Sequence, residues 1–309
     1  MPRSSQTLSV EDRGARGASG IAQETPVAHR RLTQLRRRYV PKIGAAIVFG
    51  WLALVLILAV AAPILPLDGL SGDNEHISSG PVAGHLLGTD QMGRDTLARL
   101  IMGAQNTVLV VLLSVTLAIL IGVTSGVLAG FLGGIVEWVV GIVTDSILAF
   151  PALVLVMALV AIRGGSLRIL IIGLGIAMAP TFARLARAGT LSVRQREFVL
   201  ASVVLGTRTP RVLLRDVLPN IWPAILAYSF VVMGVLTIAE GSLSYLGFGI
   251  PAPRPSWGSM VAEGKATLLI SPHNVLIPAC ALFLTVLCLN IAGEIMQRRQ
   301  DILKTAVAL

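Results

Sequence analysis

The sequence predicts an all-α protein that crosses a membrane with six helices. Of its 309 residues, 54% are hydrophobic and 13% are charged, whereas a soluble domain is about 25% charged. The mean hydropathy is +0.80. Most of six apolar stretches reach the ~20 residues that a helix needs to cross a bilayer. These stretches are 43–67, 106–130, 138–162, 169–186, 221–247 and 275–293.

The segments around these spans divide the chain. Residues 1–40 are rich in Ser, Gly, Gln and Arg without helical periodicity, which predicts a disordered, basic cytoplasmic tail. The first apolar run begins near Ile43 and is too long for a cleavable signal peptide. We expect a first transmembrane helix at 41–67, an outer loop at 68–103, a five-helix core at 104–297 and a cytoplasmic tail at 298–309. Asp145 interrupts the third span, and Arg184 closes the fourth early.

The net charge of +9 is distributed as a topology signal. Most of the 25 lysines and arginines lie in the N-terminal tail, between Arg184 and Arg215, or after Arg298. The positive-inside rule therefore places both termini in the cytoplasm. This distribution points to a lipid bilayer as the partner of the basic residues and argues against nucleic acid.

A ladder of glycines marks the second span. Gly122, Gly126, Gly130 and Gly134 recur at i, i+4 spacing and would line one helical face, so that another helix could approach closely. The approaching helix could belong to this chain or to another subunit.

No catalytic constellation is apparent. The chain has no G-x-x-x-x-G-K-[ST] phosphate-binding loop, and its four histidines lack metal-ligand spacing. We expect no metal, no cofactor bound by this chain and no enzymatic activity. Cys280 and Cys288 lie two helical turns apart in the last span and cannot pair within it.

Two carboxylates fall within predicted spans. Charges at such depth cost about 2.5–3.5 kcal/mol on insertion scales and normally face a cavity or a partner. Glu240, Ser244 and Asp145 are therefore candidates to line a translocation path. The alternatives are a proton relay and, especially for Asp145 near the cytoplasmic side, a buried structural acid.

The polar segment 196–220, which we name the island, separates the fourth and fifth spans. Its apolar residues recur at helical spacing in two short runs, and Gly206-Thr207 supplies a turn between them. Thr209 reads as an N-cap, followed by Pro210 at the first helical position. The island predicts two short helices that dock a partner on the basic side of the membrane.

Four segments resemble one family. They are 85–104 (HLLGTDQMGRDTLARLIMGA), 145–155 (DSILAFPALVL), 239–264 (AEGSLSYLGFGIPAPRPSWGSMVAEG) and the island. They are similar to C-type permease subunits of ABC importers in the dipeptide/oligopeptide/nickel branch. The resemblance implies a six-helix type I ABC importer permease in a bacterial inner membrane.

In that family the island carries the pattern E-A-A-x-x-x-G with a later Leu-Pro pair. Here Leu200 and Ser202 replace the glutamate and the second alanine, which puts in doubt any salt bridge of that glutamate. The resemblance implies that the island is the coupling helix for an ATPase subunit. Its candidate residues are Leu200, Ala201, Ser202, Gly206, Thr207, Pro210, Arg211, Leu218 and Pro219.

The resemblance also implies the partners and the cargo. A second homologous permease, two cytoplasmic ATPases that bind ATP and Mg²⁺, and an extracytoplasmic binding protein would complete an importer of peptides. Nickel or another small solute is the alternative cargo. From other classes, a proton-coupled secondary transporter using Asp145 and Glu240, and an intramembrane enzyme, stay open.

Overall fold

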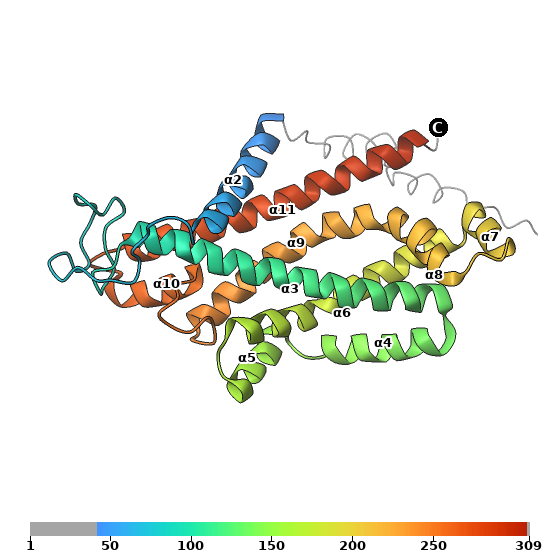
Figure 1. Cartoon of the computed structure of the whole chain (residues 1–309), viewed down its shortest axis with the longest axis horizontal. Helices are drawn as coiled ribbons and strands as arrows, with labels where there is room; N and C mark the ends of the chain where they lie inside the picture. The colour runs from blue at the N-terminus through green and yellow to red at the C-terminus, as the bar shows by residue number, and fades with distance from the viewer. Residues whose placement is uncertain (1–41, 308–309) are drawn as a thin grey trace, which may run out of the picture. The chain divides into compact units, whose positions relative to one another are not determined.

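The computed structural model describes residues 42–307, with side chains from 43 to 299 (Figure 1), and its regular elements are helices. The expected tail at 1–40 lies outside the described residues. The helices are α2 (Lys42–Ala61), α3 (Thr96–Leu132), α4 (Gly134–Leu148), α5 (Ala152–Arg163), α6 (Leu167–Arg194), α7 (Glu197–Val204), α8 (Thr209–Val212), α9 (Leu218–Tyr245), α10 (Trp257–Gly264) and α11 (His273–Val307). A π-helical turn at Leu213–Val217 joins α8 to α9, and a 3₁₀ turn at Lys265–Thr267 follows α10.

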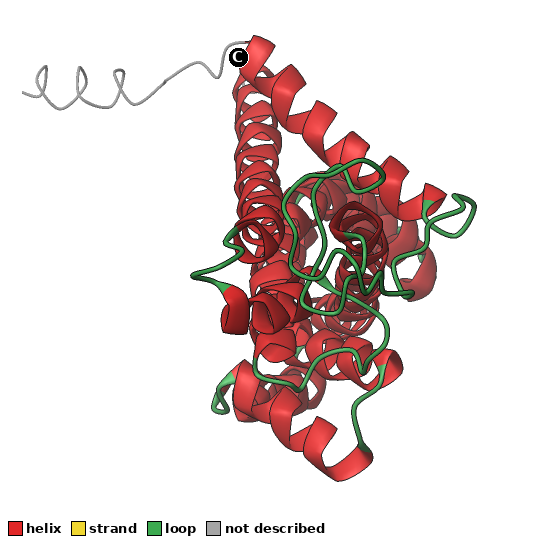
Figure 2. Cartoon of the chain, turned by 90° about the vertical axis from the view of Figure 1, so that its left-hand side faces the viewer, coloured by secondary structure: helices red, strands yellow, loops and turns green. Residues whose placement is uncertain are grey.

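The prediction of an all-α membrane protein is confirmed. Five helical segments in the described part are long and apolar enough to cross a bilayer, and the bent pair α4–α5 makes a sixth if it is counted as one span. Figure 1 shows α7 and α8 at one end of these helices and α10 at the other. The loop at 62–95 lies across the same end as α10 (Figure 2).

The close contact between α3 and α6 organises the bundle. A side chain at Gly122 or Gly126 would overlap backbone carbonyl groups of α6, and a Cβ at Gly130 would lie 2.9 Å from the Thr190 Cβ. Gly134 does not belong to this contact, because α3 ends at Leu132. Gly134 instead takes a φ of +56° in the turn before α4, and a Cβ there would meet nothing within 4 Å.

The third span is not one helix. It is broken at residues 149–151, and α4 and α5 meet there at 82°. Pro151 has no N–H to donate to the helix, and its ring disfavours the helical conformation of Phe150 before it. Continuous apolar character concealed this break in the sequence. The expected span at 138–162 is therefore not one continuous helix, and it counts as a span only as the bent pair α4–α5.

Other boundaries also differ from the expected ones. α2 ends at Ala61 rather than near residue 67, because Pro63 and Pro66 follow. α3 begins at Thr96, ten residues before the expected span, because the Asp95 carboxylate accepts a hydrogen bond from the Ala98 N–H at 2.7 Å and caps the helix. The loop between α2 and α3 accordingly runs from 62 to 95 rather than from 68 to 103.

Three helices run past the expected inner ends of their spans. α6 continues through Arg184 to Arg194, since Arg184 and Arg187 find carboxylate partners on α4. The second island helix is not separate: Thr209–Tyr245 forms one helical segment that includes the π-helical turn. α11 reaches Val307, so part of the expected tail at 298–309 is helical.

Candidate functional site

The island is anchored to the bundle by three valines. Val199 of α7, Val212 of α8 and Val217 of the π-helical turn are fully buried, and all three belong to the main hydrophobic core. That core also contains residues of α3, α5, α6 and α9. Because dense packing transmits displacement, a push on the island would reach the spans.

The outer side of α7 is apolar but exposed. Val204 and Leu205 at its tip are 86% and 83% exposed, and Leu200 is 52% exposed. Phe198 and Val203 are also exposed. A group of large apolar side chains without cover is typical of an interaction site. We call these five residues the α7 face.

A Schellman turn connects the two island helices. The Thr207 N–H donates to the Ser202 carbonyl at 3.1 Å, and the Gly206 N–H donates to the Val203 carbonyl at 3.0 Å. Gly206 has a φ of +76°, and a Cβ there would meet no atom within 4 Å. The glycine is therefore required by backbone conformation and not by crowding.

The remaining coupling candidates lie along the same segment. Thr209 is not an N-cap: it is the first residue of α8, and Arg208 before it makes no side-chain cap. Pro219 sits in the first turn of α9, directly after the π-helical turn. Ala201, Pro210, Arg211 and Pro219 are exposed, whereas Ser202, Thr207 and Leu218 are half-buried.

Glu240 connects three helices in the interior. Its carboxylate accepts hydrogen bonds from the Ser244 hydroxyl at 2.7 Å and the Thr107 hydroxyl of α3 at 3.2 Å. The Thr107 hydroxyl in turn accepts from the Trp257 N–H of α10 at 3.4 Å. Glu240 has no exposed surface. It therefore faces α3 and α10 in this conformation, with Ser244 as its neighbour.

Asp145 is not part of this cluster. Its carboxylate pairs with the Arg184 guanidinium of α6 at 2.7 Å, and both side chains are more than half exposed. Glu137 of the same helix accepts a hydrogen bond from Arg187 Nε at 2.9 Å. The structure thus brings Glu240 and Ser244 together and places Asp145 in a separate α4–α6 contact.

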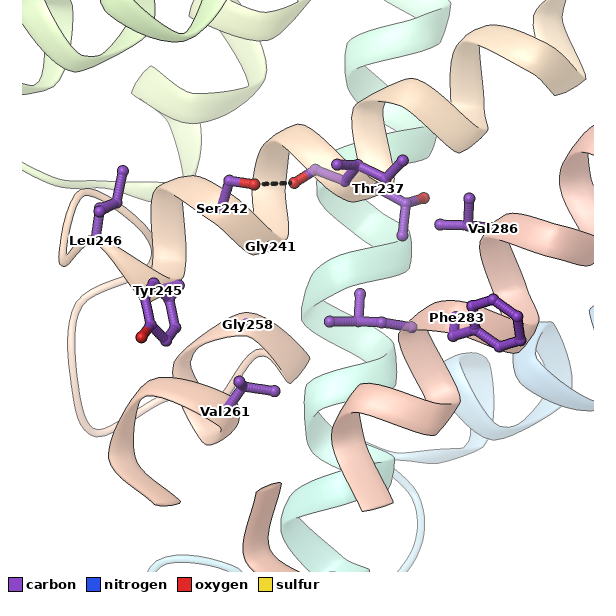
Figure 3. Close-up of a pocket in the computed structure, with 11 residues that line it drawn as sticks. Thr237, Gly241, Ser242, Tyr245, Leu246, Gly258, Val261, Phe283 and Val286 are labelled. Carbon is purple, nitrogen blue, oxygen red and sulfur yellow. Dashed lines mark hydrogen bonds between the residues drawn. The ribbon is translucent and has the colours of Figure 1, made fainter. Parts of the chain in front are cut away.

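A groove of about 550 Å³ opens between α9, α10 and α11, and its lining is mostly apolar (Figure 3). At its floor α10 meets α9 so closely that a side chain at Gly258 would overlap the Gly241 backbone. The Ser242 hydroxyl at the edge of the groove donates a hydrogen bond to the Ile238 carbonyl of its own helix at 2.8 Å. The local sequence did not reveal this groove, because its walls come from segments far apart in the chain.

An ionic junction holds α10 to α3 at the end of the bundle opposite the island (Figure 1), which we expect to be the outer end. One oxygen of Glu263 accepts hydrogen bonds from Arg94 at 2.6 Å and from Arg99 at 2.8 Å. Asp90 pairs with both arginines, at 2.7 and 3.3 Å. Arg99 is 1% exposed although it is charged. This junction has no local signal in the sequence, since the paired residues are up to 169 positions apart.

Two histidines that appeared scattered in the sequence meet in the outer loop. His76 bonds to Asp73 at 2.8 Å, and His85 bonds to Asp95 at 3.1 Å. The hydrogen bond from His76 holds the pKa of the Asp73 carboxyl below its ordinary value. Within the described residues, no group of three or more His, Cys, Asp or Glu side chains could hold a metal ion.

Comparison with known families identifies the chain. A family model for the inner membrane component of binding-protein-dependent transport systems matches residues 122–302. The chain belongs to this family. The match includes the island, α9, α10 and most of α11.

Curated relatives agree with this assignment. The glutathione transport system permease protein GsiD of Shigella flexneri serotype 5b (strain 8401) is 36% identical over 262 residues, which cover 84% of this chain and 86% of the relative. GsiD of Escherichia coli O6:K15:H31 (strain 536 / UPEC) is 33% identical over the same shares. This similarity places the chain in the peptide/oligopeptide branch of ABC importer permeases.

Solved structures show the same fold. The chain matches the MetNI methionine ABC transporter in its inward-facing conformation with a TM-score of 0.52 and 18% identity, over 65% of this chain and 96% of that one. A second crystal form gives a TM-score of 0.50. The type I ABC importer permease fold expected from the resemblance is confirmed.

The family assignment decides among the function classes. The chain is a multi-pass membrane permease of an ABC importer, a transport subunit rather than an enzyme. Its homologues are permeases that work with ATPase and binding-protein partners. The hypotheses of a proton-coupled secondary transporter and of an intramembrane enzyme are therefore rejected.

Proposed function

We propose that this chain forms half of the translocation path for short peptides and receives the movement of an ATPase through the island. The exposed α7 face, fastened to the core by buried Val199, Val212 and Val217, carries this proposal. Such a surface combines a contact site for a partner with rigid attachment to the spans.

The helical segment that begins within the island provides the mechanical connection. Thr209–Tyr245 is a segment of 37 residues, or about 55 Å at 1.5 Å per residue. At its far end, Glu240 and Gly241 contact α3 and α10. Tilting of this segment by the ATPase would therefore displace α10 and the groove beside it.

Peptide cargo is supported by the relatives. The two GsiD proteins are permeases for glutathione, which is peptide-like, and they match over most of their length. A second permease subunit would supply the other half of the path. Two ATPases would bind ATP and Mg²⁺, an outer binding protein would deliver the cargo, and both termini would lie in the cytoplasm, as the positive-inside rule favours.

Movement between two states is sufficient for this mechanism. ATP on the partner subunits favours one state of the permease pair, and the loaded binding protein biases the same equilibrium from the other side. No group of this chain needs to react with the cargo.

Reconstitution of the complete transporter in vesicles tests the proposal. We expect uptake of short peptides, glutathione included, that requires ATP and the binding protein and continues when the proton gradient is collapsed. Uptake of nickel but not of peptides would overturn the assignment of peptides as the cargo. Uptake without ATP would overturn the mechanism.

A further inference from the structure

The α7 face has an unusual chemistry for a docking surface on a cytoplasmic loop. The position that carries glutamate in the family pattern is Leu200, and it is exposed beside Val203 and Val204. We infer that the ATPase subunit receives α7 in an apolar groove with an acidic rim, and that Leu200 binds there by burial in place of an ion pair. This inference rests on the proposed coupling role of the island.

Exposure and anchoring together support the apolar groove. On α7 the buried Val199 faces the core, whereas Leu200 and Val203 remain about half exposed and Val204 and Leu205 more than 80% exposed. Leaving such side chains in water is unfavourable, and burying them in a partner recovers that free energy. If the groove of the partner were lined with charged groups, those groups would lose their hydration on binding and would form no ion pairs with the apolar side chains of α7.

Four arginines support the acidic rim. Arg196 precedes α7 in the sequence, and Arg208, Arg211 and Arg215 follow it within the island; all four are exposed. Among the described residues, no carboxylate lies within 4.0 Å of any of them, although Glu197 and Asp216 are close in sequence. Complementary charge on a partner increases specificity and the association rate more than raw affinity.

The competing explanation is a membrane surface. Arginines beside exposed apolar side chains also suit anionic headgroups. The Schellman turn argues for a protein groove, because it fixes α7 and α8 in one compact, bent unit joined to the core. A groove can match such a shape, whereas a bilayer surface does not require it.

Affinity between the purified permease pair and the ATPase subunits, measured in detergent without lipid, tests the inference. Restoring the family residue with Leu200→Glu should weaken binding by about tenfold or more, since the carboxylate would be buried without a partner. Leu200→Met should change affinity less than twofold. Both substitutions keep good helix formers at an exposed position, so the fold of α7 is preserved.

The rim is tested separately. Arg211→Glu combined with Arg215→Glu should slow association severalfold and flatten its dependence on salt, because screening acts on exposed charges. Arg299→Glu on α11, an exposed arginine outside the island, is the matched control and should leave both unchanged. If the two island substitutions change neither the association rate of the ATPase in detergent nor its salt dependence, the acidic rim is overturned. That result would favour a membrane surface as the partner of these arginines.

A cross-linking arm separates this inference from the proposed function. Val204→Cys, in a background with Cys280→Ser and Cys288→Ala and labelled at its thiol with a maleimide-linked benzophenone, should photo-cross-link to the ATPase. Absence of that product would overturn the coupling role itself. Cross-linking together with unchanged or tighter binding of Leu200→Glu would overturn only the apolar groove.

Discussion

The two ends of this molecule differ in what their side chains contact. At the outer end, Asp90, Arg94, Arg99 and Glu263 pair with one another, and Glu240 is hydrogen-bonded beneath α10. At the inner end, the α7 face exposes large apolar side chains that the described chain leaves uncovered. The carboxylates named at the outer end therefore find partners within the described chain, whereas we expect another protein to cover the α7 face at the inner end. Substitutions at the outer end should therefore affect folding, and substitutions at the inner end should affect coupling.

The strongest test of the inner end is Gly206→Val, which we expect to abolish uptake while the protein still inserts and folds. Valine strongly disfavours the φ of +76° found at Gly206, so the Schellman turn would open and mis-aim α7. Gly206→Asn is the matched control, because asparagine tolerates the left-handed region, and it should retain most activity. Uptake by the valine variant at the normal rate would contradict the coupling role of this turn.

At the outer end, Glu263→Ala should produce the largest loss of stability. It removes the shared acceptor of Arg94 and the buried Arg99, and breaking such a network costs about 3–5 kcal/mol when the remaining charge is fully buried. We expect a smaller loss than this, since Glu263 is one-third exposed and Asp90 remains. The thermal unfolding midpoint of the purified protein measures it, with Glu75→Ala in the outer loop as the exposed-acid control. An unchanged midpoint would show that the outer end does not depend on this pairing.

Glu240→Gln should have a moderate effect on uptake. It extends the comparison to a carboxylate that lies within a membrane-spanning helix. Glutamine retains oxygen and nitrogen atoms near Ser244 and Thr107, so α10 should stay attached and ATP-driven uptake should fall by no more than severalfold. Glu240→Leu removes both hydrogen bonds and should lower stability further. Abolition of uptake by the glutamine variant, with stability intact, would mean that the charge itself is needed.

Asp145→Asn should have the smallest effect. Its pair with Arg184 is more than half exposed on both sides, and pairs of this kind contribute about 0–1 kcal/mol. Stability should hardly change. Glu137→Gln, which removes the neighbouring pair with Arg187 between the same two helices, should have a similarly small effect. A large loss of uptake without a loss of stability would instead place Asp145 on the path, as its position in the sequence suggested.

Local features of the sequence predicted the inner end well. Glycine at 206 indicated the turn that its positive φ requires, and the island stood out because arginines and apolar residues alternate there. The coupling role of these residues remains a prediction. The π-helical turn that merges α8 with α9 was missed, because the island was interpreted as two short helices separate from the fifth span.

The outer end was largely invisible to such reasoning. Arg99 and Glu263 are 164 residues apart, and Thr107 and Glu240 are 133 apart. No local period encodes these pairs, since they form only when α9 and α10 pack against α3. Glu240 was recognised as a costly buried charge, but its partners could not be named.

The glycine contact between α3 and α6 has a consequence for how the chain is made. α3 leaves the ribosome before α6, so the surface at Gly122 and Gly126 first meets lipid or the insertion machinery. Translation proceeds at about 5–20 residues per second, so the stretch from the end of α3 to the end of α6 takes on the order of 3–12 s. During biogenesis α3 must therefore wait several seconds for the helix that its glycines fit, and α4 and α5 must stay clear of that surface until α6 arrives.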